Sequence, residues 1–157
     1  KHHDSMQGFL KNLVEFIPHS WKYAEIACAS ILFHNESYKS KNFKWTEWKQ
    51  SSPITVNDEL AGNVTVVYSE DRPVEDEGPF LKEERTLLDS IAQRIGDTFV
   101  RITAQQELRE NNMQLLIERK ALQETNAALR IVLSNIEEEK KRKGKLTSVD
   151  AGLRTGV

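Results

Sequence analysis

Apolar residues follow a helical period at the start of this chain of 157 residues. Within residues 6–17 they recur at spacings of three and four, at Phe9, Leu10, Leu13, Val14 and Ile17. This period predicts an amphipathic helix. Asp4 or Ser5 can cap its first turn, and Pro18 ends it.

The next apolar run, residues 24–34, contains no helix breaker and has small or apolar residues on both faces. It predicts a central strand that is covered on both sides. A turn follows at residues 34–37, and residues 38–44 then alternate polar with aromatic side chains. This alternation predicts an edge strand protected by lysines.

Residues 49–56 and 60–70 flank Asn57-Asp58-Glu59 and predict a hairpin. Pro53 in the first arm favours an outer or bulged strand, because proline cannot donate to a central ladder. The second arm predicts one buried and one mostly hydrated face, with Val67 as the exception. Its expected buried face holds Leu60, Gly62, Val64, Val66 and Tyr68.

Residues 71–78 form an acidic segment with Pro73 and Gly78, which predicts a surface loop. Pro79 suits the first turn of a helix, and Glu83 and Glu84 complement the positive end of that helix. The order helix, four strands, helix predicts an α+β fold with a small antiparallel sheet and flanking helices.

Residues 80–143 contain no proline, and Gly96 is their only glycine. A helix of this length would measure about 90 Å, far longer than the preceding domain. Its first part carries the broad apolar stripe expected of a helix that packs on a sheet. That stripe consists of Leu88, Ile91, Ile95, Phe99 and Ile102.

A repeat of seven follows, and a strict seven-residue repeat implies a left-handed supercoil. The d positions are Leu108, Leu115, Leu122, Leu129 and Ile136, and the a positions are Gln105, Asn112, Arg119, Asn126 and Leu133. Leucine at d with asparagine at a favours a parallel two-stranded coiled coil. Four of the five a positions are polar, so we expect a weak seam, suited to a signalling coil with two close states.

Composition narrows the class of protein. The net charge of −2 gives no overall field that favours nucleic acid, and no apolar run is long enough to span a membrane. The single cysteine, Cys28, allows no internal disulfide and favours the cytoplasm. Residues 1–5 are expected to be a tag remnant, and residues 144–157 a linker or a vector-derived tail.

Few residues suggest site chemistry. Cys28 has no partner at metal-ligand spacing, so a buried small side chain is favoured over metal binding or thiol catalysis. Trp45 and Trp48, with Tyr38 or Tyr68, are candidates for an aromatic ligand wall, and packing at a sheet edge is the competing interpretation. The acidic loop is expected to be solvated rather than a cation site. No nucleophile–base pair or carboxylate dyad is evident, so neither enzymatic activity nor a metal site is predicted.

Several segments taken together resemble a compact GAF sensory domain, the type found in sensor histidine kinases and response-regulator-like transcription factors. The resemblance covers roughly residues 6–102. The segments are Ile17-Pro18-His19-Ser20-Trp21, Ile26-Ala27-Cys28-Ala29-Ser30-Ile31, Tyr38 with Phe43-Lys44, Trp48-Lys49-Gln50, and Glu77-Gly78-Pro79-Phe80-Leu81-Lys82-Glu83-Glu84-Arg85. Residues 43–49 and 57–60 are shorter than the connections that close the pocket in larger GAF domains, which disfavours a small-molecule ligand.

The domain organisation predicted is a GAF-like domain at residues 6–102 and a coiled coil at residues 103–143. The function predicted is a non-enzymatic module of signal transduction that forms a homodimer and passes conformational signals to an output domain. Two alternatives remain: a small-molecule sensor, or haem sensor through Cys28, and a structural dimerisation segment of a transcription regulator. Direct contact with nucleic acid or membrane is not expected.

Overall fold

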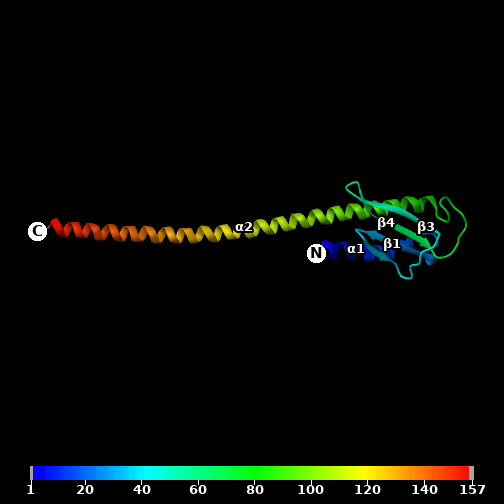
Figure 1. Cartoon of the computed structure of the whole chain (residues 1–157), viewed down its shortest axis with the longest axis horizontal. Coiled ribbons are helices and arrows are strands. Elements are labelled where there is room, and N and C mark those ends of the chain that lie inside the picture. Colours follow the sequence, from blue (N-terminus) through cyan, green and yellow to red (C-terminus); the bar gives the residue numbers. More distant parts are fainter. Residues whose placement is uncertain (1, 156–157) are drawn as a thin grey trace. The chain divides into compact units, whose positions relative to one another are not determined.

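The computed structural model describes the backbone of residues 2–155 and the side chains of residues 5–145. The chain divides into two units that meet between Glu107 and Leu108. Its elements, in order, are α1 (His2–Phe16), the short 3-10 turns η1 (Ile17–Ser20) and η2 (Ala24–Ile26), β1 (Ala27–Phe33), β2 (Glu36–Lys39), β3 (Lys49–Val56), β4 (Glu59–Tyr68) and α2 (Lys82–Thr155) (Figure 1). The predicted α+β order is confirmed.

The four strands form one antiparallel sheet in the order β2-β1-β4-β3. Two tight hairpins build it, with positive φ angles at His34 and Asn35 (48° and 66°) and at Asn57 and Asp58 (52° and 65°). Asparagine and aspartate tolerate this left-handed backbone, which matches the twist of antiparallel strands. The Asn57-Asp58 turn therefore forms where the sequence predicted it.

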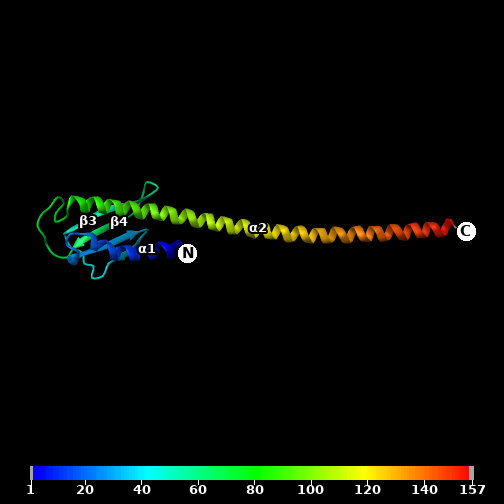
Figure 2. The same cartoon turned by 180° about the vertical axis from the view of Figure 1, so that it is seen from behind.

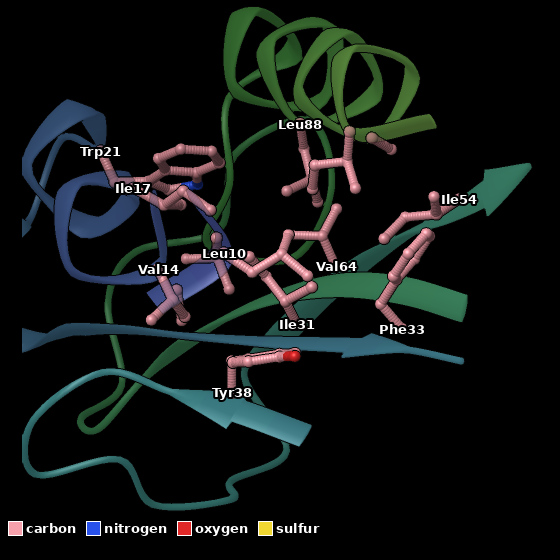
Figure 3. Packing of buried hydrophobic residues seen from close by; sticks show 14 of the residues in the cluster. Leu10, Val14, Ile17, Trp21, Ile31, Phe33, Tyr38, Ile54, Val64 and Leu88 are labelled. Carbon is pink, nitrogen blue, oxygen red and sulfur yellow. The ribbon is translucent and has the colours of Figure 1, made fainter. Parts of the chain in front are cut away.

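Both helices pack on the same face of the sheet, as Figure 3 shows for Leu10 and Val14 of α1 and Leu88 of α2. Figure 2 shows the same arrangement of α1, the sheet and the first turns of α2 from behind. The buried cluster between these layers draws one stripe from each helix and alternate residues from each strand. It includes Met6, Leu10, Val14, Ile17, Ala29, Ile31, Phe33, Ile54, Val64, Val66, Leu88, Ala92 and Ile95.

The opposite face of the sheet is covered only in part, which corrects the prediction that both faces of β1 are covered. Residues 40–48 connect the two edge strands and lie over the end of the sheet where Cys28 and Val67 are buried. Lys39 and Lys49 extend from this face, and their ammonium groups stand 6.0 and 5.7 Å from the centre of the Trp45 ring. Toward the other end Leu32 and Leu60 are exposed, although Leu60 was expected to be buried.

Several boundaries differ from those predicted. The edge strand β2 covers residues 36–39 rather than 38–44, because the chain must leave the sheet early to cross to its opposite edge. The second long helix begins at Lys82, so Pro79 precedes its first turn. Helix α1 begins at His2, which places Asp4 and Ser5 within the helix rather than before it.

The ends of the chain carry more helix than the sequence indicated. Helix α1 takes in residues 2–5, and α2 continues through residues 144–155, which were expected to be a linker or tail. Lys1 and residues 156–157 lie outside the described residues. Pro53 lies on an edge strand, as predicted, and a bulge follows between Ile54 and Thr55.

Gly96 marks the point where α2 crosses β3 most closely. A β-carbon built on Gly96 would lie 2.2 Å from the carbonyl oxygen of Thr55. Such a contact is far shorter than van der Waals packing allows, and backbone atoms cannot move aside without shifting the whole strand. The only glycine of predicted helix 80–143 is thus explained by helix–sheet packing.

Gly96→Ala is expected to destabilise the protein by about 1–3 kcal/mol, although alanine favours a helix over glycine by about 1 kcal/mol. Gly144→Ala is the matched control, because Gly144 lies in the same helix and a β-carbon added to it would have nothing within 4 Å. That control should leave stability equal or raise it. Urea denaturation followed by far-ultraviolet circular dichroism measures both, and a stabilising Gly96→Ala would contradict the close approach.

Candidate functional site

The predicted dimer seam lies on a continuous part of α2 and is exposed in the single chain. Its apolar members are each more than half accessible, from Leu108 at 62% to Ile136 at 54%. Together they are Leu108, Leu115, Leu122, Leu129, Leu133 and Ile136. A contiguous apolar surface on an exposed helix is typical of a surface that contacts another molecule.

The polar a positions Asn112, Arg119 and Asn126 lie on the same exposed stretch of helix as the leucines. Within residues 108–145, side-chain hydrogen bonds run along the helix from the Gln114 amide to Glu118 and from the Thr125 hydroxyl to the carbonyl of Ala121. Neither engages an a position. The seam side chains are therefore directed to solvent in the single chain.

Five exposed apolar residues of this segment were not part of the predicted seam. Leu116 and Val132 occupy e and g positions, which flank an a/d seam and widen it. Met113, Ile117 and Ile131 occupy b and f positions, which face away from it. The sequence could have indicated these residues, because their heptad positions follow from the same numbering as the seam.

The first turn of α2 is fastened to the sheet by Glu84, a residue that the sequence assigned only to the helix dipole. Glu84 is 5% exposed. One carboxylate oxygen accepts from the backbone N–H of Leu81 at 2.7 Å, and the other accepts from the backbone N–H of Lys22 at 2.9 Å and the hydroxyl of Tyr68 at 3.3 Å. The bond to Leu81 is the acidic half of a capping box. Burial, followed by the nearby Glu84 carboxylate, raises the pKa of Tyr68.

Arg85, the next residue, anchors the neighbouring side of the turn. Two of its nitrogens donate to the two oxygens of Glu77, and a third donates to the carbonyl of Ser51 at 2.7 Å. Gln50 donates to the same Glu77 carboxylate at 2.7 Å and accepts from the buried indole of Trp21 at 2.8 Å. Such bidentate charge-assisted pairs are directional. Glu84 and Arg85 together fix the rotation of α2 about its axis.

The acidic loop is thus tied down rather than merely solvated. The Arg85 hydrogen bond is the largest cause that lowers the pKa of the Glu77 carboxyl. Glu75 pairs with Lys22 at 3.4 Å, and Asp76 accepts from the backbone N–H of Lys82 at 3.0 Å.

The three aromatic residues predicted as a ligand wall do not form one. Tyr68 is fully buried on the helix-covered face, where its ring stacks on Phe80 with centroids 4.6 Å apart. Trp48 packs at the edge of that core. Trp45 lies on the opposite face between Lys39 and Lys49, as their ring contacts show. Successive strand residues alternate between faces, and this separates the side chains.

A hollow that the sequence did not indicate lies where α1, the first hairpin and α2 meet. It measures about 180 Å³ and is lined by Met6, Gln7, Phe33, His34, Glu36, Tyr38 and Phe99. This is below the roughly 300 Å³ of common ligand sites. The Tyr38 hydroxyl donates to Glu36 at 2.9 Å, and burial, followed by that hydrogen bond, raises the pKa of Tyr38 to about 12.

Cys28 is buried on the other face of β1, and its thiol donates to the carbonyl of Asn42 at 3.5 Å. Burial is the main cause that raises the pKa of this thiol, which keeps it protonated and a poor nucleophile. The environment is that of a packed small side chain.

The pH dependence of stability tests the Arg85–Glu77 pair. Because the folded-state pKa of Glu77 lies below its ordinary 4.5, the pair stabilises above pH 4.5 and loses its effect as pH falls through the lowered pKa. Glu77→Gln should therefore lower the melting temperature near pH 6, and the difference from wild type should shrink at lower pH. Glu47→Gln, at an exposed position, is the control for loss of one carboxyl group. A difference that does not change with pH would contradict this role of Arg85.

Comparison of the chain with family models, with curated proteins and with solved structures gave no match. Within the described residues, no three His, Cys, Asp or Glu side chains gather closely enough to hold a metal ion. In the same part of the chain, no helix is both long and apolar enough to cross a membrane.

Proposed function

We propose that this protein is a non-enzymatic, dimerising module of signal transduction. In this proposal residues 6–102 form a compact GAF-like domain, and residues 103–143 form a parallel two-stranded coiled coil with its twin. The observation that carries the proposal is the exposed seven-residue repeat of leucines on a helix whose first turn is locked to a folded core. A cytoplasmic location and an output domain of histidine kinase or helix-turn-helix type belong to the same proposal.

The energetics favour a dimer over a single exposed helix. Full burial of one leucine or isoleucine side chain contributes about 1.5–3 kcal/mol. Six such residues per chain line the seam, and each is more than half exposed without a partner. This gain opposes the cost of two polar asparagine layers and of Arg119, whose twin would carry the same charge.

Charge placement is compatible with a parallel homodimer. Residues at g positions face e positions five residues further along the partner helix. Within residues 103–143 the facing pairs are Ala104 with Arg109, Asn111 with Leu116, Glu118 with Gln123, Thr125 with Arg130, and Val132 with Glu137. None joins like charges. Glu118 of one chain would also lie beside Arg119 of the other, which offsets the buried arginine charge.

In this proposal, a conformational signal passes to the coil through the contacts that attach α2 to the sheet. A signal that shifts the sheet or the acidic loop would act on Glu84 and Arg85, because these residues link α2 to Tyr68, Lys22, Ser51 and Glu77. Rotation of a continuous helix changes which residues face the partner. A seam with polar a positions allows two arrangements within a few kcal/mol, and a modest input can then shift the population between them.

Charge on the seam tests dimerisation directly. Leu115→Glu with Leu129→Glu is expected to convert the dimer to a monomer, because four carboxylates would be buried in the seam of each dimer. Ile117→Glu with Ile131→Glu is the matched control, since these exposed residues occupy f positions and the change in charge is identical. Light scattering over a range of concentrations measures the mass of each variant. Equal masses for the two double variants would contradict the seam, and so would a monomeric wild-type chain.

The polar a positions allow a second test. Asn112→Leu with Asn126→Leu should raise the melting temperature of the helix and weaken its preference for two strands, because buried asparagine specifies register and oligomer state at a cost in stability. Circular dichroism and light scattering measure both properties. An unchanged melting temperature would show that residues 112 and 126 do not lie in an interface.

A further inference from the structure

The hollow where α1, the first hairpin and α2 meet has walls that are largely aromatic. The rings of Phe33 and His34 stack with centroids 4.2 Å apart. Phe99 of α2 meets Phe33 edge-on at 5.2 Å and His34 at 4.9 Å. Tyr38 supplies a fourth ring from β2, and Figure 3 shows its hydroxyl directed toward the end of β1 that carries Phe33. We refer to this space of about 180 Å³ as the aromatic hollow.

A carboxylate, that of Glu36, lies beside these rings on the inner face of the sheet. Burial alternates along β2, so that Glu36 and Tyr38 turn toward the helices while Ser37 and Lys39 are exposed. Glu36 also pairs directly with Phe33 of β1, and directly paired residues of neighbouring strands share a face. Phe33 belongs to the buried core. Carboxylates seldom occupy the core side of a sheet, and this one therefore calls for a specific role.

Two hydrogen bonds hold the Glu36 carboxylate in its orientation. The Gln7 amide of α1 and the Tyr38 hydroxyl both donate to its Oε2 atom, each at 2.9 Å. Both donors are uncharged, so these two bonds orient the negative charge without cancelling it. Of the described residues that line the hollow, none is lysine or arginine, so none of them would repel a cation.

A negative charge held beside several aromatic rings fits a quaternary ammonium ion. The faces of aromatic rings attract cations, and cages of such rings are the usual sites for quaternary ammonium groups. A quaternary ammonium has no N–H group. The Glu36 charge therefore attracts it without any exchange of the hydrogen bonds that this carboxylate already makes. The size also agrees, because a cavity of roughly 150 Å³ accepts benzene, and a trimethylammonium group is comparable in size to benzene.

We propose that the aromatic hollow binds a small compound with a quaternary ammonium group. Glu36 supplies the opposite charge, and Phe33, Tyr38 and Phe99 supply the aromatic walls. This site does not depend on the connections 43–49 and 57–60, whose shortness disfavours a ligand elsewhere, because neither lines the hollow. The inference goes beyond the proposed dimer and does not rest on it. Since Phe99 belongs to α2, the ligand would contact the sheet and the long helix together, as an input signal should.

The two methionines of the chain allow a test that resolves the site. Met6 lines the hollow, whereas Met113 is 58% exposed on the later part of α2. With carbon-13 methyl groups on both, NMR follows each one while the full chain is titrated with tetramethylammonium chloride at constant ionic strength. The Met6 methyl is expected to shift until it saturates, and the Met113 methyl is not. Sodium chloride in place of the ligand should give no saturable shift of either.

A pair of ligands separates charge from shape. Choline and 3,3-dimethylbutan-1-ol have nearly the same shape, but the second has a carbon atom in place of the charged nitrogen. Choline is expected to bind several-fold more tightly, as measured by the Met6 shift of the wild-type chain. This comparison needs no variant, so it decides the matter even where a substitution disturbs the fold.

Two matched pairs of variants assign the residues. Glu36→Gln should weaken choline binding several-fold, because it removes the charge and keeps the volume. Glu47→Gln, at an exposed position outside the hollow, should leave binding unchanged. Phe99→Leu should weaken binding several-fold through loss of a ring, whereas Phe16→Leu should not, since Phe16 is 70% exposed on α1 and does not line the hollow. Circular dichroism checks that each variant is folded.

The outcomes that would overturn the site are distinct from those that concern the dimer. Absence of a saturable Met6 shift, or equal affinity for choline and the neutral alcohol, would overturn it. Unchanged affinity in folded Glu36→Gln would do the same, because the hollow would then bind without its charge. Light scattering on the same samples reports the dimer separately. Binding by a monomeric chain would contradict the dimer and leave the ligand site in place.

Discussion

The rotation of α2 about its own axis is fixed where its first turn meets the sheet. Glu84 binds three groups from three segments, and Arg85 binds a strand carbonyl and the Glu77 carboxylate. The close crossing at Gly96 adds a steric limit about three turns later. These contacts decide which side chains of α2 face the core, and the same helical count decides which face away from it.

The helical spacing of apolar residues along α2 underlies its proposed role. The core takes Leu88, Ala92 and Ile95, and the residues one position earlier on the helix, including Leu87 and Ile91, border a shallow groove between α1 and α2. From Leu108 onward every described side chain is exposed, and the apolar ones recur in sevens. The first part of α2 thus presents an apolar face to its own domain, and the later part presents one to solvent. Such a helix is suited to couple the domain to whatever covers the later part. In the proposed dimer, the polar a positions would keep that coupling weak enough for a modest signal to shift it.

Local chemistry made much of the fold predictable from the sequence. The turn at Asn57-Asp58, the proline of β3 and the period of α1 each require a particular backbone, so their prediction succeeded. The partial covering of the sheet face opposite the helices was not predictable. It depends on where residues 40–48 cross the sheet, and this depends on a strand order that the sequence does not state. Because the strand order was unknown, the prediction also placed Tyr68 and Trp45 in one site, although they lie on opposite faces of the sheet. The Glu84 contacts were missed because they join residues 16 to 62 positions apart.

In the proposed dimer, two α2 helices lie parallel and in register. Nitroxide labels at Glu110, Glu124 or Glu138, all f positions, test it most directly by pulsed electron–electron double resonance in a Cys28→Ser chain. A parallel, in-register pair predicts the same short distance between twin labels at all three positions, because twin f positions lie at the same height on opposite sides of the same coil. An antiparallel pair would separate twin labels by tens of ångströms at one end or both, since residues 110 and 138 are about 42 Å apart along a helix. That result, or the absence of any coupling between labels, would contradict the account.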